Sequence, residues 1–197
     1  MIANGLTCLQ CATAVIDTSF EKLVGIKYFT ALSWKPESRE RQTVYIKALL
    51  FQCRTNIEII YGQFKSKTKF CPLCSKKFTA HEEKLTDVNL AIHLFENASK
   101  NTFDEAIIVS ADSDLIPPIK AIKGNFPEKI ISVLPPINNP AIDLINNAHK
   151  RYKMKSKTLL SSLLPNPCGT LKMPKSWQYE NYMFDKATDT TDTGRTL

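Results

Sequence analysis

The chain has 197 residues, of which 43% are hydrophobic and 23% are charged. These values are typical of a globular protein, and the length fits one domain with a tail or a small insert. There is no run of about 18 apolar residues, which argues against a membrane-spanning helix, and the N-terminus lacks the basic leader of a signal peptide. We therefore expect a cytoplasmic protein with no membrane contact.

The net charge is +7, and the basic residues are grouped along the sequence. Five lysines and no acidic residue lie between Glu58 and Glu82, and seven basic residues and no acidic residue lie between Asp143 and Glu180. Stretches of one sign attract polyanions such as nucleic acids by releasing counterions. Surface lysines also serve solubility alone, so charge by itself leaves both explanations open.

The first half of the chain reads as a strand, a helix and a second strand. Residues 24–31 (VGIKYFTA) are rich in β-branched and aromatic residues and predict a strand. A helix is expected from near Ser38, with Val44, Ala48 and Phe51 at helical spacing and Leu49 beside them. Residues 57–64 (IEIIYGQF) predict the second strand. The lysine-rich stretch 65–84 then interrupts the pattern and is expected to be a loop or small insert.

The second half continues the alternation. Thr86 is expected to cap a helix whose apolar stripe includes Val88, Ala91, Phe95 and Ala98, with Leu94 adjoining. Residues 105–110 (EAIIVS) predict a strand buried on both faces, followed by a short helix from Ser113 or Leu115 to Lys123. A fourth strand is expected in 129–136 and a last helix in 140–150. Such alternation predicts an α/β fold with a mainly parallel sheet and helices on both faces.

Two aspartates follow the third predicted strand directly. Asp112 and Asp114 lie just after Ser110, at the carboxyl end of the strand, where open α/β sheets bind ligands. Two carboxylates one residue apart in a turn can converge on Mg²⁺ or Mn²⁺, which prefer oxygen ligands. Asp87, in the first turn of the preceding helix, is the third candidate ligand. The alternatives are that Asp87 only stabilises its helix terminus and that the aspartate pair only starts the next helix.

These segments resemble the NYN family, whose members are metal-dependent, ribonuclease-like domains of the PIN superfamily. The resemblance covers about residues 23–150 and rests on Lys84, Asp87 and Val88, then on Ser110 to Asp114, with Pro117 shortly after. It implies a Rossmann-like, PIN-like three-layer α/β/α sandwich. The resemblance and the composition together predict an atypical N-terminal segment at 1–22, the NYN/PIN-like domain at 23–155 with a cysteine-containing insert at 65–82, and a basic extension at 156–197 whose Thr- and Asp-rich tail is expected to be disordered.

The resemblance has one departure. Family members open with a strand that ends in Asp-Gly-x-Asn-Leu, whose Asp is a metal ligand, and no such motif precedes the strand at 24–31. We therefore expect that this strand is missing or replaced, which leaves unpaired strand edges in the sheet and removes one ligand.

The resemblance implies a divalent-metal-dependent endoribonuclease, a hydrolase acting on RNA. Asp87, Asp112 and Asp114 would hold Mg²⁺ or Mn²⁺, and the metal would activate water and steady the charge on the phosphate. Basic residues would contact the RNA backbone without reading its sequence. The residues assigned to nucleic-acid binding are Lys65, Lys67, Lys69, Lys84, Lys150 and Arg151. Whether the chain forms a homo-oligomer or binds another protein is left open.

The cysteines indicate a second metal. Cys71 and Cys74 form a C-x-x-C pair, which is half of a zinc site. His81 and Cys53 are candidates for the remaining two ligands, and the pair Cys8/Cys11 is the alternative. Reduced thiols in a loop are the competing explanation. His93 and His149 are expected to be structural rather than catalytic.

Three functions therefore remain open. The leading hypothesis is a metal-dependent RNA-cleaving domain. The second is a non-catalytic basic module that binds RNA or has a regulatory role. The third is a zinc-stabilised interaction domain.

Glu82 and Glu83 are expected to be exposed linker charges or groups that support the acidic cluster.

Overall fold

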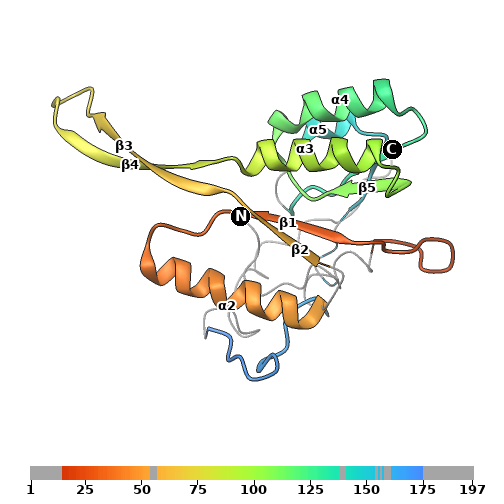
Figure 1. Ribbon diagram of the computed structural model, residues 1–197, viewed down its shortest axis with the longest axis horizontal. Helices are drawn as coiled ribbons and strands as arrows, with labels where there is room; N and C mark the ends of the chain where they lie inside the picture. Colours follow the sequence, from red (N-terminus) through yellow and green to blue (C-terminus); the bar gives the residue numbers. More distant parts are fainter. Residues whose placement is uncertain are drawn as a thin grey trace, which may run out of the picture.

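The computed structural model describes residues 15–53, 57–137, 141–153, 155, 157 and 161–174, and all structural statements concern these ranges. They form a mixed α/β fold of helices and parallel strands with one antiparallel hairpin (Figure 1). In chain order the elements are β1 (Ile26–Thr30), α2 (Pro36–Cys53), β2 (Ile57–Tyr61), β3 (Gln63–Phe70), β4 (Lys77–Lys84), α3 (Thr86–Ser99), β5 (Glu105–Ile108), the 3₁₀ helix η2 (Ser113–Leu115), α4 (Ile116–Asn125), β6 (Ile130–Val133), α5 (Ile142–Asn147) and β7 (Lys150–Arg151).

The parallel strands form two separate sheets. β1 pairs with β2, with Ile26 opposite Ile57, and β5, β6 and β7 form a second parallel sheet in that order. Within the described residues, β1 and β5 are therefore each paired along one edge only. The parallel pairing of these strands is confirmed, and the expectation that the family's first strand is missing or replaced stays a prediction.

Helices lie on both sides of the β1–β2 pair. Figure 1 shows α2 on one side and α3 on the other, with α4 beyond α3. The core around α3 to α5 is formed by buried side chains of α4, β6 and α5, among them Ile119, Ile131 and Leu144. Aliphatic side chains at this depth supply most of the free energy that holds the helices on the strands.

A second core lies beneath α2 and extends beyond residue 155. Ala48 and Leu49 of α2 pack with Leu164, Cys168 and Met173, which are all buried. Residues 161–174 therefore cover one face of α2, although sequence analysis assigned them to a basic extension. The remaining part of the predicted tail, from residue 175 on, lies outside the described residues.

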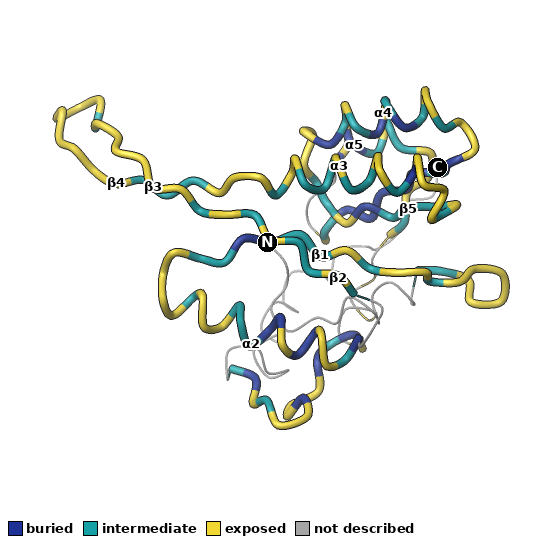
Figure 2. Tube along the Cα trace, in the orientation of Figure 1, coloured by how far each residue is buried: buried dark blue, intermediate teal, exposed yellow. Residues whose placement is uncertain are grey.

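The lysine-rich segment is a small β-hairpin insert, which is the second of the two expected alternatives, and it is not a loop. β3 and β4 pair antiparallel from Gln63–Lys84 to Phe70–Lys77 and extend away from the helices as an exposed arm (Figures 1 and 2). Lysines alternate with Phe64, Ser66, Thr68 and Phe70 along β3, which is the period of a strand. That alternation could have predicted a strand from the sequence, but the high lysine content favoured the expectation of a loop.

Several element boundaries also differ from the predictions. Thr86 does not cap α3, because Leu85 holds the capping position and no side-chain hydrogen bond caps the helix. Val88 and Phe51 are exposed rather than part of an apolar contact face. In the third predicted strand only Ile108 is buried, so the strand is not covered on both faces.

The C-terminal boundary of the last helix was wrong as well. α5 ends at Asn147, and Lys150 and Arg151 instead pair with Ser132 and Val133 of β6 as strand β7. No helix in the described part of the chain is both long enough and apolar enough to span a membrane.

Candidate metal and nucleic-acid site

Asp112 and Asp114 lie where the chain leaves β5 and enters η2. The Asp112 backbone N–H donates to Ser110 Oγ at 3.1 Å, and Asp112 Oδ1 accepts from the Asp114 backbone N–H at 2.9 Å. Asp112 therefore caps η2, as the helix-starting alternative expected. A carboxylate has two oxygens with several lone pairs, so this bond still leaves Asp112 able to bind a cation. Pro117 and Pro118 follow in the first turn of α4, where missing N–H groups cost little.

Asp87 reaches the same region from the first turn of α3. The residue between the hairpin and the helix, Leu85, has a left-handed φ of 78°, which is uncommon for a side chain of its size. Thr86 Oγ1 donates to Glu83 Oε1 at 2.6 Å across this junction. A Cβ on Gly62 would lie 2.7 Å from the Lys84 carbonyl oxygen, so the chain between β2 and β3 packs tightly beneath it.

The negative charges of the two aspartates after β5 act on the carboxyl group of Asp87. Partial burial of the Asp87 carboxyl, followed by the negative charges of Asp112, Glu83 and Asp114, raises its pKa above the ordinary value of 3.8. Carboxylates on α3 and on the β5–η2 segment are therefore close enough to repel one another. Such repulsion is relieved by proton binding or by a cation.

The carboxylates do not form a closed coordination shell. Asp87, Asp112 and Asp114 are all exposed, and the described residues contain no group of three or more His, Cys, Asp or Glu side chains arranged to hold a metal ion. Their oxygen donors and mutual repulsion fit the chemistry of Mg²⁺ or Mn²⁺. Their assignment as ligands stays a prediction.

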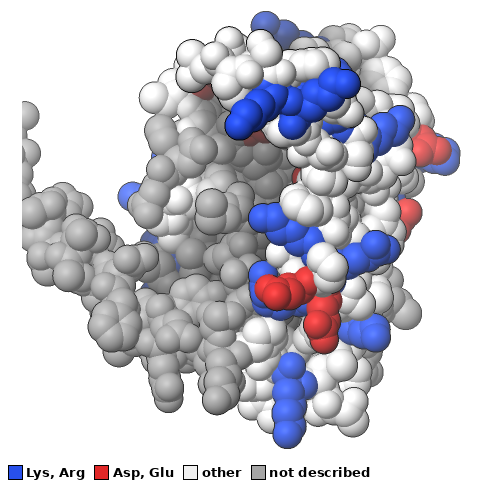
Figure 3. Space-filling view, turned by 90° about the vertical axis from the view of Figure 1, so that its left-hand side faces the viewer, with Lys and Arg blue, Asp and Glu red and all other residues white. Residues whose placement is uncertain are grey.

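The hairpin places most of the predicted RNA-binding lysines on one face. Residues of β3 alternate in direction, and directly opposed residues of β4 share their face, which puts Lys65, Lys67, Lys69 and Lys84 on the same side. We call these four side chains the basic face of the arm. All four are exposed. Figure 3 views the molecule from the side on which the arm projects in Figure 1 and shows Lys and Arg side chains spread over the described surface, with a few acidic side chains among them.

One acidic residue interrupts this basic face. Glu82 accepts from Lys69 Nζ at 2.6 Å and from Lys84 Nζ at 3.2 Å. Hydrogen bonds from these two lysines, and then their charges, lower the pKa of Glu82 to about 2. Glu82 is thus an ion-pair partner of the lysines, a role that sequence reasoning missed because the pairing depends on the hairpin.

The remaining two basic candidates lie on β7. Lys150 Nζ donates to Glu105 Oε2 at 2.8 Å, and Glu105 also accepts from Ser132 Oγ and from the Tyr152 hydroxyl at 3.0 Å. Lys150 therefore joins a network between β5, β6 and the strand after α5, while Arg151 beside it is exposed. Their assignment to RNA stays a prediction.

The structure separates the suggested zinc ligands. Cys71 and Cys74 lie at the tip of the arm, but Cys53 is buried at the end of α2. His81 pairs with Ser66, four residues from the last residue of β3, which is roughly 13 Å along the strand. Its ring stacks on Trp34 with centroids 3.8 Å apart. Neither Cys53 nor His81 can therefore join the pair, and Cys8 and Cys11 lie outside the described residues.

The other two histidines have structural surroundings. The Ile131 backbone N–H donates to His149 Nδ1 at 2.9 Å, which ties the end of α5 to β6. His93 lies against Phe29 with ring centroids 5.7 Å apart, and its Nδ1 is buried without a hydrogen-bond partner among the described residues.

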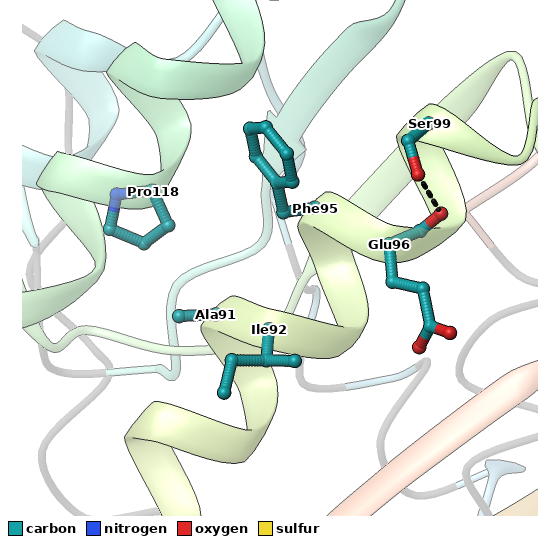
Figure 4. Close-up of a pocket in the computed structure, with 6 residues that line it drawn as sticks. All are labelled: Ala91, Ile92, Phe95, Glu96, Ser99 and Pro118. Atoms are coloured by element: carbon teal, nitrogen blue, oxygen red, sulfur yellow. Dashed lines mark hydrogen bonds between the residues drawn. The ribbon is translucent and has the colours of Figure 1, made fainter.

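A shallow apolar groove lies along α3. It is lined by Ala91, Ile92, Phe95, Glu96 and Ser99 of α3 and by Pro118 of α4 (Figure 4). None of the three aspartates lines it, and it contributes Glu96 as its only ionisable group. We therefore place the candidate site at the aspartates.

Comparison with known proteins assigns the family. The family model described as NYN domain matches residues 15–155, which is most of the chain. The chain belongs to the NYN domain family. This domain suggests a ribonuclease-type nuclease fold of the PIN-like kind, and such nucleases generally use divalent metals.

Two individual proteins resemble this NYN chain. The 6-hydroxy-3-succinoylpyridine 3-monooxygenase HspA of Pseudomonas putida (strain DSM 28022 / S16) is 32% identical over 178 residues, covering 77% of this chain and 57% of that protein. The chain therefore spans little more than half the length of this relative. A crystal structure of a Vibrio parahaemolyticus protein of unknown function matches 77% of this chain and 80% of its own, with 18% identity and a TM-score of 0.49.

Proposed function

We propose that this NYN domain cleaves RNA with the help of Mg²⁺ or Mn²⁺ and that its helices and strands form a PIN-like three-layer α/β/α arrangement. The proposal rests on one observation above all, namely that α3 packs against η2 and so brings the segment that carries Asp87 next to the segment that carries Asp112 and Asp114. Partial burial and the negative charges of Asp112, Glu83 and Asp114 raise the pKa of Asp87, which agrees with this proximity. Carboxylates that repel one another favour a site that binds a cation.

Asp87, Asp112 and Asp114 are the residues that would hold the metal. When bound, a divalent metal activates water and stabilises the charge that develops on a phosphate during hydrolysis. The chain itself positions these groups. Ser110 and the η2 turn fix Asp112, and the β4–α3 junction fixes Asp87. The raised pKa also means that the Asp87 carboxyl holds a proton more readily than an ordinary aspartate carboxyl does.

The arm would bring the RNA to these carboxylates. Lysines 65, 67, 69 and 84 share one exposed face, and Lys84 lies only three residues before Asp87. Contacts of lysine with phosphates fix the position of a nucleic acid without reading its bases. We therefore expect binding to RNA with little sequence preference and with a strong dependence on salt.

The decisive experiment replaces Asp112 with asparagine. Asparagine caps helices as well as aspartate does, so Asp112→Asn should keep η2 intact while it removes one negative ligand. We expect wild-type protein to cleave single-stranded RNA in Mn²⁺ and the Asp112→Asn variant to lose this activity with an unchanged circular dichroism spectrum. Asp143→Asn is the matched control, because Asp143 is exposed on α5. Equal cleavage by all three proteins, or cleavage that EDTA does not stop, would remove the proposal.

The second candidate is a non-catalytic RNA-binding module. It is favoured by the open arrangement of the aspartates and by the lack of an Asp-Gly-x-Asn-Leu motif in the 197 residues. This candidate predicts salt-dependent RNA binding in the wild type and in Asp112→Asn alike, with no cleavage in any metal.

One relative is named as a 6-hydroxy-3-succinoylpyridine 3-monooxygenase. Incubation of the protein with 6-hydroxy-3-succinoylpyridine, in parallel with RNA, is therefore a further control.

A further inference from the structure

The tip of the arm carries two cysteines in a closed turn. The Ser75 N–H donates to the Cys71 carbonyl at 2.8 Å, and the Cys71 N–H donates to the Lys76 carbonyl at 2.9 Å. Ser75 takes a left-handed φ of 55°, which turns the chain back into β4. The turn therefore holds both thiols at the end of a two-stranded arm, far from the helical body (Figure 1).

The turn also favours a thiolate at Cys71. Backbone N–H groups of Cys74 and Leu73, and then the Cys74 side chain, hydrogen-bond to the Cys71 sulfur and lower the pKa of its thiol. Thiolates are the form that binds zinc, and N–H donors to sulfur orient and stabilise such ligands.

The described part of the same chain does not complete the site. A structural zinc site needs four ligands, and no third His, Cys, Asp or Glu joins this pair in any described metal-binding group. Of the two candidates suggested by the sequence, His81 lies down the arm and Cys53 is buried at the end of α2. The ligands that are still needed must come from outside the described residues.

We propose that two copies of this chain meet at their arm tips and share one zinc ion, each supplying Cys71 and Cys74. A two-fold axis through the metal turns one pair into four thiolates, so an identical second copy is a sufficient partner. The tip presents exposed apolar side chains at Phe70, Leu73 and Phe78, and Leu73 is 95% exposed. A second copy would cover this surface, which is unusual for an isolated arm in water.

The charges at the tip fit such a site. Zinc with four thiolates carries a net charge of about −2, while Lys76 and Lys77 flank the cysteines on the β4 side. Assembly converts four thiols and one Zn²⁺ into four zinc–sulfur bonds and releases the protons that the thiols still hold. No oxidant is needed, and all four sulfurs stay reduced.

The test uses the full chain, reduced with a phosphine and stripped of metal by a chelator. We expect Zn²⁺ to bind at about one ion for every two chains and to shift the mass from 22.2 kDa toward twice that value in light scattering. Co²⁺ should give the intense thiolate charge-transfer absorption of a tetrahedral all-sulfur site. Cys71→Ser together with Cys74→Ser should abolish both effects.

Two further variants distinguish the possible sources of the missing ligands. Cys8→Ser with Cys11→Ser leaves the tip intact and should change neither the zinc ratio nor the dimer. Leu73→Ser keeps every ligand but should weaken the zinc-dependent dimer at least about tenfold, because Leu73 loses its covered surface. One zinc per monomeric chain, loss of zinc in the Cys8/Cys11 variant, or no zinc binding at all would each overturn the proposal.

The zinc site shares no residue with the acidic cluster, so its test is independent of the proposed nuclease. Asp112→Asn protein should dimerise with zinc as the wild type does. A protein that dimerises without cleaving RNA would refute the nuclease alone, and a monomeric protein that cleaves RNA would refute the shared site alone.

Discussion

Replacing Glu82 with glutamine should strengthen RNA binding and make it more dependent on salt. Glu82 binds Lys69 and Lys84, the two lysines of the basic face that lie in ion pairs in the described structure. Their charges are thus partly neutralised before any phosphate arrives. Glutamine removes the negative charge, keeps the shape of the side chain and frees both ammonium groups for RNA.

The size of the effect follows from counterion release. Each lysine that contacts a phosphate of single-stranded nucleic acid adds about 0.7 to the slope of log affinity against log salt concentration. Two released lysines therefore steepen the slope by about 1.4, so that affinity falls by roughly a further sevenfold between 50 and 200 mM salt. Fluorescence anisotropy with a labelled single-stranded RNA, repeated over that range of salt, measures the slope directly.

Glu83→Gln is the matched control, because it changes the net charge equally from the adjacent position. Glu83 points to the other face of β4 and hydrogen-bonds to Thr86 instead of to a lysine of the arm. We expect a much smaller change of slope for Glu83→Gln. Equal slopes in the two variants would mean that only net charge matters and that the basic face does not bind RNA.

Three further predictions concern stability. Asp87→Asn should raise the melting temperature at pH 7, because partial burial and neighbouring charges raise the pKa of Asp87 and disfavour its ionised form. The gain in melting temperature should shrink as the pH falls through that raised pKa. A lower melting temperature of the variant at pH 7 would contradict the repulsion between the carboxylates. Glu105→Gln should cost about 1–3 kcal/mol in urea unfolding at pH 7. Burial acts to raise the pKa of Glu105, but hydrogen bonds from Lys150, Ser132 and Tyr152 outweigh it and leave the pKa lowered, so the wild-type advantage should disappear in acid as the pH falls through that lowered value. Leu85→Gly should stabilise the fold by about 1 kcal/mol because it relieves a left-handed backbone, whereas Leu85→Ala should bring no such gain.

The strands and helices of the α/β fold could be predicted because their signals are local. Apolar β-branched runs marked β1, β2, β5 and β6, and the NYN-like motif placed Asp87, Asp112 and Asp114 at the ends of neighbouring elements. The parallel pairing of β1 with β2 and of β5 with β6 also followed from the alternation of strands and helices along the sequence.

The parts that could not be predicted depend on pairings between distant residues. The partnership of Glu82 with Lys69 appears only when β4 folds back on β3, and the stacking of His81 on Trp34 joins segments far apart in the chain. Thr86 has the side chain of a capping residue, but its hydroxyl is used by Glu83 and Leu85 takes the capping position. The first two features depend on contacts between distant segments, and the third depends on a side-chain hydrogen bond across the β4–α3 junction.

The connection between the arm and the aspartates explains why binding and cleavage should be separable. Lys84 ends the basic face, and Asp87 begins the acidic cluster three residues later, so the sign of the charge changes across one turn of chain. An RNA phosphate drawn along the lysines meets carboxylates that repel it unless a divalent cation lies between them. Under the proposed function, the arm alone would hold RNA in the absence of metal, and the RNA backbone would approach Asp112 and Asp114 only when the cation is bound. Substitutions in the arm should then change affinity at every metal concentration, whereas substitutions in the cluster should change only the metal-dependent step.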